Sequence, residues 1–445
     1  MSGNLCFGQN ESNKWYFGWN AGLDFMTNPP TILTGSLVTQ EGCASIADAA
    51  GNLLFYTDGL TVYNSTHAVM ANGNNLMGNG STTQAAVIVK KAGTSNMYYV
   101  FTNDDVAGID GLRYSEIDMN LASGQGSVTV KNTFLVNGLT EKLTSVRHCN
   151  GTDVWVMVHD NTANNFRAFQ VSSGGVNPNP VVSAVGPNNV GVVGYMKFSP
   201  NGKKLALAVY SSSVQVYDFD PATGVVSNSL GLPGATAYGC EFSPDGTKLY
   251  ASGGTKVYQW DLCAGSPTAV AASLYTVSAT GPWGMQLASN GKIYVTRYTT
   301  TTLGVVNNPN VGGSGCNYVD LGQSISPNTA RLGLPNFITS SLAPPATPFT
   351  HTVSNSFGCQ TASFTAPPVV QNFSLTGCAA SGYSLNSMLW IFGDPASGSA
   401  NTSTLTNPAH AFTSLGTYTT SLIMYYTCGG GTDTIKQVVV INQPC

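Results

Sequence analysis

The sequence contains a short repeat that constrains the fold more than any other feature. Residues 195–205 read YMKFSPNGKKL, and residues 238–249 and 283–293 repeat this pattern as YGCEFSPDGTKL and WGMQLASNGKI. Each copy has an apolar segment, a turn at Asn-Gly or Asp-Gly, and a second apolar segment, which is the pattern of a β-hairpin. A hairpin that returns about every 45 residues is typical of β-propeller blades, so the sequence predicts this fold for most of the chain.

Six segments of the chain have the pattern of complete blades. Besides the three copies above, they contain residues 43–58, 86–101 and 144–158. A seventh blade can be assembled from the two ends of the array, because residues 333–338 resemble an inner strand, whereas residues 14–18 and 22–25 resemble second and third strands. Pairing between them would close the ring and remove exposed strand edges. We therefore predict an all-β protein with a seven-bladed β-propeller, and six blades is the alternative.

The composition changes at a proline-rich segment, residues 340–348. Its three prolines cannot continue a β-ladder and favour an extended spacer. The following residues alternate between apolar and polar positions in several strand-sized segments, with the size and pattern of an immunoglobulin-like β-sandwich. The sequence thus predicts a propeller over residues 1–339 that is closed by N- and C-terminal strands, a linker over 340–348 and a sandwich over 349–445.

Charged residues make up only 9% of the chain, against about 25% in ordinary soluble proteins. The net charge is −4 and the 17 lysines and arginines are scattered, so the sequence disfavours nucleic-acid binding. No apolar run approaches the roughly 20 residues that span a bilayer. This neutral, hydroxyl- and amide-rich composition predicts a secreted protein at the cell surface. The chain begins MSGNLC, without the features of a signal peptide, so we expect that a leader was removed or replaced.

The ten cysteines form an even set in a chain that has an extracellular composition. No C-x-x-C pair is present, and disulfides are therefore favoured over metal binding. The pairing does not follow from the sequence. Cys378 with Cys428 is the preferred pair, because each lies on or beside a predicted strand of the C-terminal domain.

The C-terminal unit resembles the PKD family, whose members are immunoglobulin-like sandwiches of surface proteins. The resemblance lies in WIFGD at 390–394, NPAHAF at 407–412 and LGTY at 415–418, followed by a last strand at 434–441. It implies that the tryptophan packs in the core and that the Gly-Asp pair shapes a turn. The residues of the motif are Trp390, Gly393, Asp394, His410, Gly416 and Tyr418.

Most of the chain also resembles the propeller-plus-PKD proteins secreted by gliding and related Bacteroidota. The matching segments are residues 15–25, 41–46, 51–59, 111–116 and 334–337. The resemblance implies export by the type IX secretion system and a role in surface adhesion or gliding motility.

Motifs for catalysis are absent from the sequence. It contains no G-x-S-x-G elbow, no H-E-x-x-H and no phosphate-binding loop, so no enzyme and no organic cofactor are expected. The best metal candidate is an acidic loop that could offer several oxygen ligands to calcium. Its residues are Asn103, Asp104, Asp105 and Asp110. The alternative is an ordinary exposed turn, in which Asp and Gly are common.

Two further features bear on binding and modification. Trp15, Tyr16, Phe17 and Trp19 are so close together that some are expected to face outward, where a ring could stack on a sugar; burial between blades is the alternative. Thr434 lies in an Asp-Thr-Ile triplet that fits the O-glycosylation pattern of Bacteroidota.

These observations predict a non-enzymatic surface protein that acts in adhesion or assembly. Its expected partners are other cell-surface or secretion-system proteins, or surface glycans. One alternative is a carbohydrate-binding or carbohydrate-active propeller, which predicts carboxylates converging near exposed aromatic rings on one face. Another is a structural subunit of an extracellular filament that self-assembles through the edge strands of the sandwich.

Overall fold

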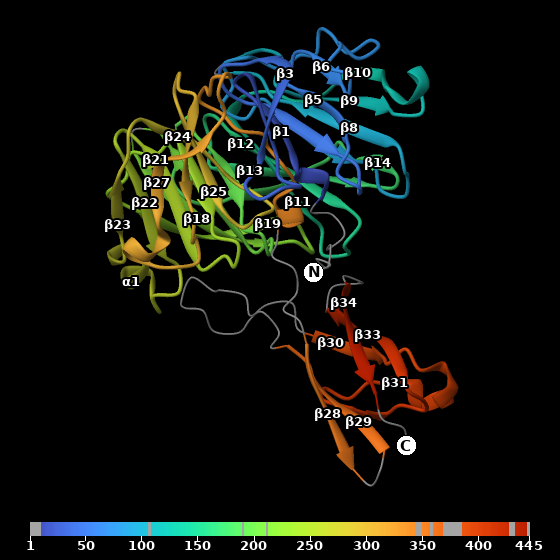
Figure 1. Ribbon diagram of the computed structural model, residues 1–445. Helices are drawn as coiled ribbons and strands as arrows, with labels where there is room; N and C mark the ends of the chain where they lie inside the picture. Colours follow the sequence, from blue (N-terminus) through green and yellow to red (C-terminus); the bar gives the residue numbers. More distant parts are fainter. Residues whose placement is uncertain are drawn as a thin grey trace.

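The computed structural model describes residues 10–105, 108–188, 191–210, 212–342, 349–356, 359–367, 385–426 and 432–442. The prediction of an all-β chain is confirmed: small antiparallel sheets dominate the described residues (Figure 1). Within these ranges, no helix is both long and apolar enough to cross a membrane.

Seven small antiparallel sheets occupy the described part of the chain from Lys14 to Ser324. The first three contain β1 (Lys14–Phe17), β2 (Trp19–Asp24) and β3 (Thr31–Val38); β4 (Ala44–Ala47), β5 (Leu53–Thr57) and β6 (Val62–Asn64); and β7 (Ala86–Lys90), β8 (Met97–Thr102), β9 (Leu112–Asp118) and β10 (Ser127–Val136). The fourth contains β11 (Leu139–Arg147), β12 (Val154–Asp160), β13 (Asn165–Ser172), β14 (Gly175–Val176) and β15 (Val181–Ala184).

The last three of these sheets contain β16 (Met196–Phe198), β17 (Lys204–Val209), β18 (Ser213–Asp220) and β19 (Val225–Leu232); β20 (Gly239–Phe242), β21 (Lys248–Gly253), β22 (Lys256–Asp261) and β23 (Tyr275–Ser278); and β24 (Pro282–Leu287), β25 (Ile293–Arg297), β26 (Thr302–Val306) and β27 (Tyr318–Ser324). The helical segments are α1 (Pro267–Ala272) and the 3-10 turns Asn10–Ser12, Ala122–Gly124, Gly313–Cys316, Thr339–Leu342 and Pro395–Asn401.

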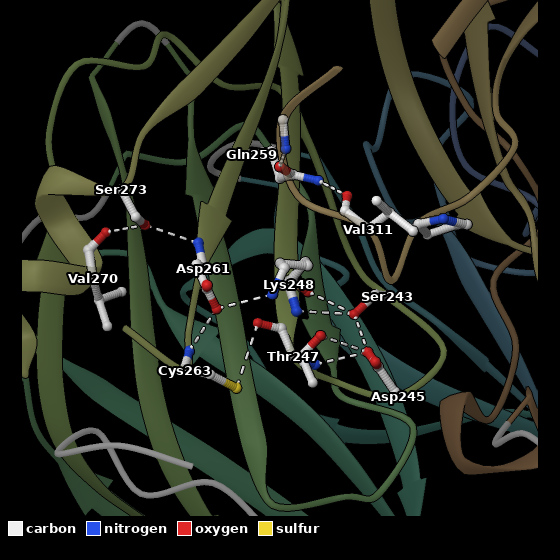
Figure 2. A network of polar contacts seen from close by, with 12 residues as sticks. Ser243, Asp245, Thr247, Lys248, Gln259, Asp261, Cys263, Val270, Ser273 and Val311 are labelled. Carbon is white, nitrogen blue, oxygen red and sulfur yellow. Dashed lines mark hydrogen bonds and ion pairs between the residues drawn. The ribbon is translucent and has the colours of Figure 1, made fainter. Parts of the chain in front are cut away.

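The repeated turn is held by the side chains that the repeat contains. Ser243 Oγ donates to Asp245 Oδ1 (2.7 Å) and accepts from the Lys248 amide (2.9 Å), as Figure 2 shows. The Lys248 ammonium reaches Asp261 on the next strand at 2.9 Å. Gly246 has a φ of 72°, a backbone conformation that favours glycine. The Ser-Pro-Asp-Gly sequence therefore closes the hairpin, and the lysine joins it to the third strand.

The first strands of the second to seventh sheets, called here the inner strands, follow one another: β4, β7, β11, β16, β20 and β24. Backbone hydrogen bonds join neighbours, such as Tyr195 N to Tyr238 O (2.8 Å) and Gln84 N to Glu141 O (3.2 Å). Apolar side chains pack between successive sheets. Trp15 on β1 and Phe25, which follows β2, pack on Tyr294 of the seventh sheet, with ring centroids 5.7 and 5.1 Å away. This arrangement is consistent with the predicted propeller.

The two ends of the array meet differently from the predicted pairing. An isolated antiparallel bridge joins Trp19 to Thr329, but residues 333–338 do not form a ladder with residues 14–18. Instead, Pro335 bridges Cys43 and Ile338 bridges Ser145, both in parallel. The first and last sheets are held together mainly by side-chain packing.

Residues 328–342, called here the central segment, lie against the inner strands. Asn336 N donates to Cys43 O (2.9 Å), and Asn336 Nδ2 donates to Leu143 O (2.7 Å) and Ala86 O (3.3 Å). These carbonyls belong to the second, third and fourth sheets, and a buried carbonyl without a partner is costly. Because the segment donates hydrogen bonds to these carbonyls, it lies against the inner strands and does not pair with β1.

The described C-terminal residues form two antiparallel sheets. One contains β28 (Thr350–Ser356), β29 (Cys359–Thr365) and β32 (Ala409–Ala411); the other contains β31 (Thr402–Ser403), β30 (Leu385–Ile391), β33 (Gly416–Tyr426) and β34 (Thr432–Ile441). Both sheets contribute to one apolar core around the fully buried Trp390, which also includes Phe349, Phe364 and Val439. The Trp390 ring thus packs as the sequence resemblance implied.

Three of the cysteines are buried free thiols, namely Cys43, Cys240 and Cys316. The even set therefore does not pair completely, because these three side chains serve as small apolar groups in the core of the array. Burial raises the pKa of the Cys240 thiol to about 12, which makes it a poor nucleophile. Cys378 and Cys428 lie outside the described residues, and their pairing stays a prediction.

Candidate functional site

The four acidic-loop residues are not brought together as a set of calcium ligands. Asn103 is buried and its amide donates to Thr140 O (2.9 Å), whereas Asp110 pairs with Arg113 at 3.3 Å. The Asp104 carboxylate accepts from the amides of Asp105 (2.8 Å) and Asp110 (3.0 Å). No group of three or more His, Cys, Asp or Glu side chains among the described residues could hold a metal ion. These contacts are those of a hydrogen-bonded turn, in which only Asn103 Oδ1 of the four side chains is buried without a hydrogen-bond partner.

The motif residues of the C-terminal unit form a polar cluster around Asp394. Its carboxylate accepts from Thr413 N (2.9 Å) and Thr413 Oγ1 (2.6 Å), and it lies 3.2 Å from His410 Nε2. Burial raises the pKa of Asp394, but the hydrogen bonds from Thr413 outweigh this effect and leave the pKa below its usual value. Tyr418 OH donates to Ser414 O at 2.7 Å. These contacts fix a turn.

The other motif residues and the modification candidate are also placed. Gly393 has a φ of 79°, and a Cβ there would approach Thr419 O at 2.5 Å, so this position requires glycine. Gly416 begins β33, beside the end of β34. Thr434 is exposed on β34 and is therefore accessible to a modifying enzyme.

A row of polar side chains crosses the middle of the array. Lys197, Glu241 and Gln286 occupy the same repeat position on β16, β20 and β24, and all three are buried. The Lys197 ammonium lies 3.6 Å from Glu241 Oε2 and donates to Gln286 Oε1. Burial raises the pKa of Glu241 and lowers that of Lys197. The pair is enclosed in the core, and we expect it to stabilise the structure.

A second cluster lies where the inner strands begin. Tyr238 OH donates to Glu41 Oε2 (2.8 Å), while Thr83 donates to Glu141 Oε2 through its amide (3.0 Å) and its hydroxyl (2.6 Å). Burial raises the pKa of Glu41 to about 7; the hydrogen bond from Tyr238 opposes the increase, and nearby Glu141 adds to it. Glu41 is half-buried, whereas Glu141 is buried. The cluster therefore exposes one carboxyl group that titrates near neutral pH.

Lys142 lies next to this cluster with its side chain buried. Its ammonium donates to Gly191 O (3.0 Å) and Val192 O (2.9 Å). Burial lowers the pKa of Lys142 to about 7, although the Glu141 carboxylate opposes this effect. The ammonium holds these two carbonyls.

Glu41→Gln is expected to remove a pH dependence of stability. The folded-state pKa of about 7 lies above the ordinary value of 4.5, so the folded protein favours the protonated Glu41 carboxyl group. The stability gained from this protonation is complete below about pH 4.5 and is lost as the pH rises through 7. The shift corresponds to at most about 3 kcal/mol. Urea unfolding at pH 5 and pH 8 should therefore show that the wild type loses more stability than the variant. Glu116→Gln, on β9, is the matched control, and an equal loss in wild type and Glu41→Gln would contradict the prediction.

The four aromatic residues near the N-terminus differ in exposure, and both predicted alternatives occur among them. Trp15, Tyr16 and Phe17 are buried, whereas the Trp19 side chain is 40% exposed. Three rings therefore serve the core and one faces outward.

Trp19 belongs to a set of rings on one face of the array, called here the aromatic face: Trp19, Tyr210, Trp283 and Tyr298. Residues 329–332 of the central segment connect three of these rings. Trp19 N donates to Thr329 O (2.9 Å). Thr299 N, next to Tyr298, donates to Ala330 O, and Gly284 N, next to Trp283, donates to Leu332 O (both 3.0 Å). Tyr210 stacks on Trp283 with ring centroids 6.1 Å apart. Tyr210 and Tyr298 are 47% and 45% exposed.

The aromatic face adjoins the Glu41 cluster through Tyr238. The Tyr238 ring packs edge-on against Trp283 at 5.2 Å, and its hydroxyl binds Glu41. Exposed aromatic rings beside a partly exposed carboxyl group form a surface suited to polar ligands with apolar faces. A small pocket also occurs among the described residues, lined by Ile46, Ile88, Arg147 and Phe337, and it contains none of the aromatic-face rings.

Comparisons with known proteins give a likeness of fold and nothing more specific. No family model and no curated protein matches the chain. A provisionally assigned 6-phosphogluconolactonase of Bacteroides uniformis is 12% identical, with 92% of this chain and 99% of that chain covered and a TM-score of 0.34. The β-propeller domain of Myceliophteria thermophila Cps50 (Swd1) is 9% identical, with coverage of 64% and 94% and a TM-score of 0.37. Hydrazine synthase of Kuenenia stuttgartiensis is 12% identical, with coverage of 68% and 79% and a TM-score of 0.35. Similarity at this level does not indicate the function of this chain.

Proposed function

We propose that this protein is a secreted, non-enzymatic surface protein whose seven-bladed β-propeller binds glycans in adhesion. A PKD-like sandwich over residues 349–445 would act as its spacer or docking unit. Export by a type IX-like system and a link to gliding or adhesion are part of the same proposal, and they rest on the resemblance of the sequence. The observation that carries the binding role is the aromatic face.

Two features favour binding on this face over binding inside the array. The central segment and the Lys197–Glu241 pair occupy the middle, where Asn336 and both charged groups are buried. In contrast, Trp19, Tyr210 and Tyr298 present large areas of ring to solvent. Flat rings on a rigid scaffold suit the apolar faces of sugars, and several weak contacts on one surface add up to useful avidity.

The carboxylates favour binding over hydrolysis. A glycosidase needs two carboxyl groups that reach the same glycosidic bond. Glu41 is partly exposed next to the aromatic face, but the Glu141 carboxylate is buried and engaged by Thr83. Glu241 is buried as well. We therefore place the aromatic face among binding surfaces and not among catalytic sites.

A second candidate function is the filament subunit, and β34 favours it. This strand lies at the end of its sheet, and Val438 and Val440 are exposed along it. An edge with exposed apolar side chains is a template for pairing with another chain. Light scattering tests this candidate, and a strictly monomeric protein at high concentration would contradict it.

Tyr210→Ala and Tyr298→Ala are each expected to weaken glycan binding at least about tenfold, which is roughly 1.4 kcal/mol. Both residues are nearly half exposed, so their removal should leave the fold intact. The measurement is a glycan array followed by titration calorimetry with the strongest ligand. Phe134→Ala is the matched control, because this ring is 49% exposed on β10. The proposal fails if no glycan binds, or if the two tyrosine variants bind as tightly as the wild type.

A further inference from the structure

Arg331 is held between two rings of the aromatic face. Its guanidinium carbon lies 3.6 Å from the centroid of the Trp19 ring and 4.8 Å from that of the Tyr298 ring. The residue is only 6% exposed, whereas Trp19 and Tyr298 are 40% and 45% exposed. Two cation–π contacts thus hold the guanidinium beside these rings.

Arg331 forms no ion pair among the described residues. Arg113, Arg167 and Arg297 each form an ion pair with an aspartate. No carboxylate of the described residues lies within 4.0 Å of Arg331, and its Nε is buried without a hydrogen-bond partner. A desolvated charge without a counterion is costly, so an anion at this position would be bound favourably.

We propose that Arg331 binds the carboxylate of an acidic saccharide, so that the aromatic face selects acidic sugars over neutral ones. A guanidinium presents a planar fork of donors that matches a carboxylate. The flanking rings and the Tyr210–Trp283 stack would bind the sugar rings that carry this group. The inference rests on the proposed glycan binding and names its ligand class.

The test compares carboxylate-bearing saccharides with their own methyl esters. A panel of uronic-acid and sialic-acid oligosaccharides, their methyl esters, neutral oligosaccharides and sulfated oligosaccharides would be titrated into the full chain. We expect at least one free acid to bind ten or more times more tightly than its ester, and this difference to shrink with added salt. Arg331→Gln should abolish the preference, and Arg331→Lys should restore only part of it. Lys256→Gln is a control that removes an exposed cation on β22.

The outcomes separate the two proposals. If acids and esters bind equally, or if only sulfated sugars bind, the acidic-saccharide inference is overturned while glycan binding stands. If nothing in the panel binds, both are overturned. If Arg331→Gln does not fold, the comparison of acid with ester on the wild-type protein still tests the acidic-saccharide inference, because it needs no variant.

Discussion

Lys197→Met is expected to lower the free energy of unfolding by about 3–5 kcal/mol, because it leaves Glu241 as an unpaired charge in the core. Both side chains are almost completely buried, and the ammonium lies 3.6 Å from Glu241 Oε2. Burial already raises the pKa of Glu241, so the carboxyl group of the variant can protonate more readily as the pH falls. The loss, measured by urea unfolding, should therefore be larger at pH 8 than at pH 5.

A double variant isolates this charge effect from the loss of packing. Lys197→Met with Glu241→Gln removes both charges of the pair, while the glutamine oxygen can still accept from one of the two amides that Glu241 engages through separate oxygens, Phe242 N at Oε1 and Leu287 N at Oε2 (both 3.0 Å). We expect the double variant to be clearly more stable than Lys197→Met alone. Lys248→Met is the control: the side chain of its partner Asp261 is 42% exposed and keeps water when the lysine is lost, so the loss should stay below about 1 kcal/mol. Equal losses in the single and double variants would show that packing, and not charge, explains the effect.

The strands and hairpins of the array were predictable because their determinants are local. The apolar segments and the Asn-Gly and Asp-Gly turns of the repeat identify β16–β17 and β20–β21, and the same chemistry recurs at β24–β25. The Trp390 core could likewise be inferred from a short motif. In each case neighbouring residues in the sequence decide the structure, and distant contacts only reinforce it.

The path of the central segment and the polar clusters could not be predicted in the same way. Residues 333–338 have the pattern of a strand, but Asn336 binds carbonyls 193 and 250 residues away in the sequence. The sequence does contain a sign of the buried charges, because Lys197 and Glu241 occupy the same position of the repeat among apolar neighbours. That signal indicates a buried polar position, but it does not identify the partner. Glu41, Arg331 and the aromatic face depend wholly on how the sheets bring distant residues together.

Trp390→Ala is expected to destabilise the C-terminal unit by about 3–5 kcal/mol and to leave the rest of the chain unchanged. The indole packs 4.9 Å from Phe349 and 5.3 Å from Phe364, and its Nε1 donates to Leu405 O at 3.0 Å. Among the described residues, the core around Trp390 contains only residues from 349 onward, and the other apolar clusters contain only residues up to 342. Separate cores predict separate cooperative units.

Differential scanning calorimetry should therefore resolve two unfolding transitions, and Trp390→Ala should lower the midpoint temperature of only one of them. Trp260→Ala is the reciprocal control, because this equally buried tryptophan lies on β22 of the sheet array and should lower only the other transition. If either variant shifted both transitions together, the two parts would be one cooperative unit and the predicted boundary at residues 340–348 would be wrong. If each variant shifts its own transition, the C-terminal unit can be studied alone, and its effect on glycan binding by the aromatic face can be measured by removing it.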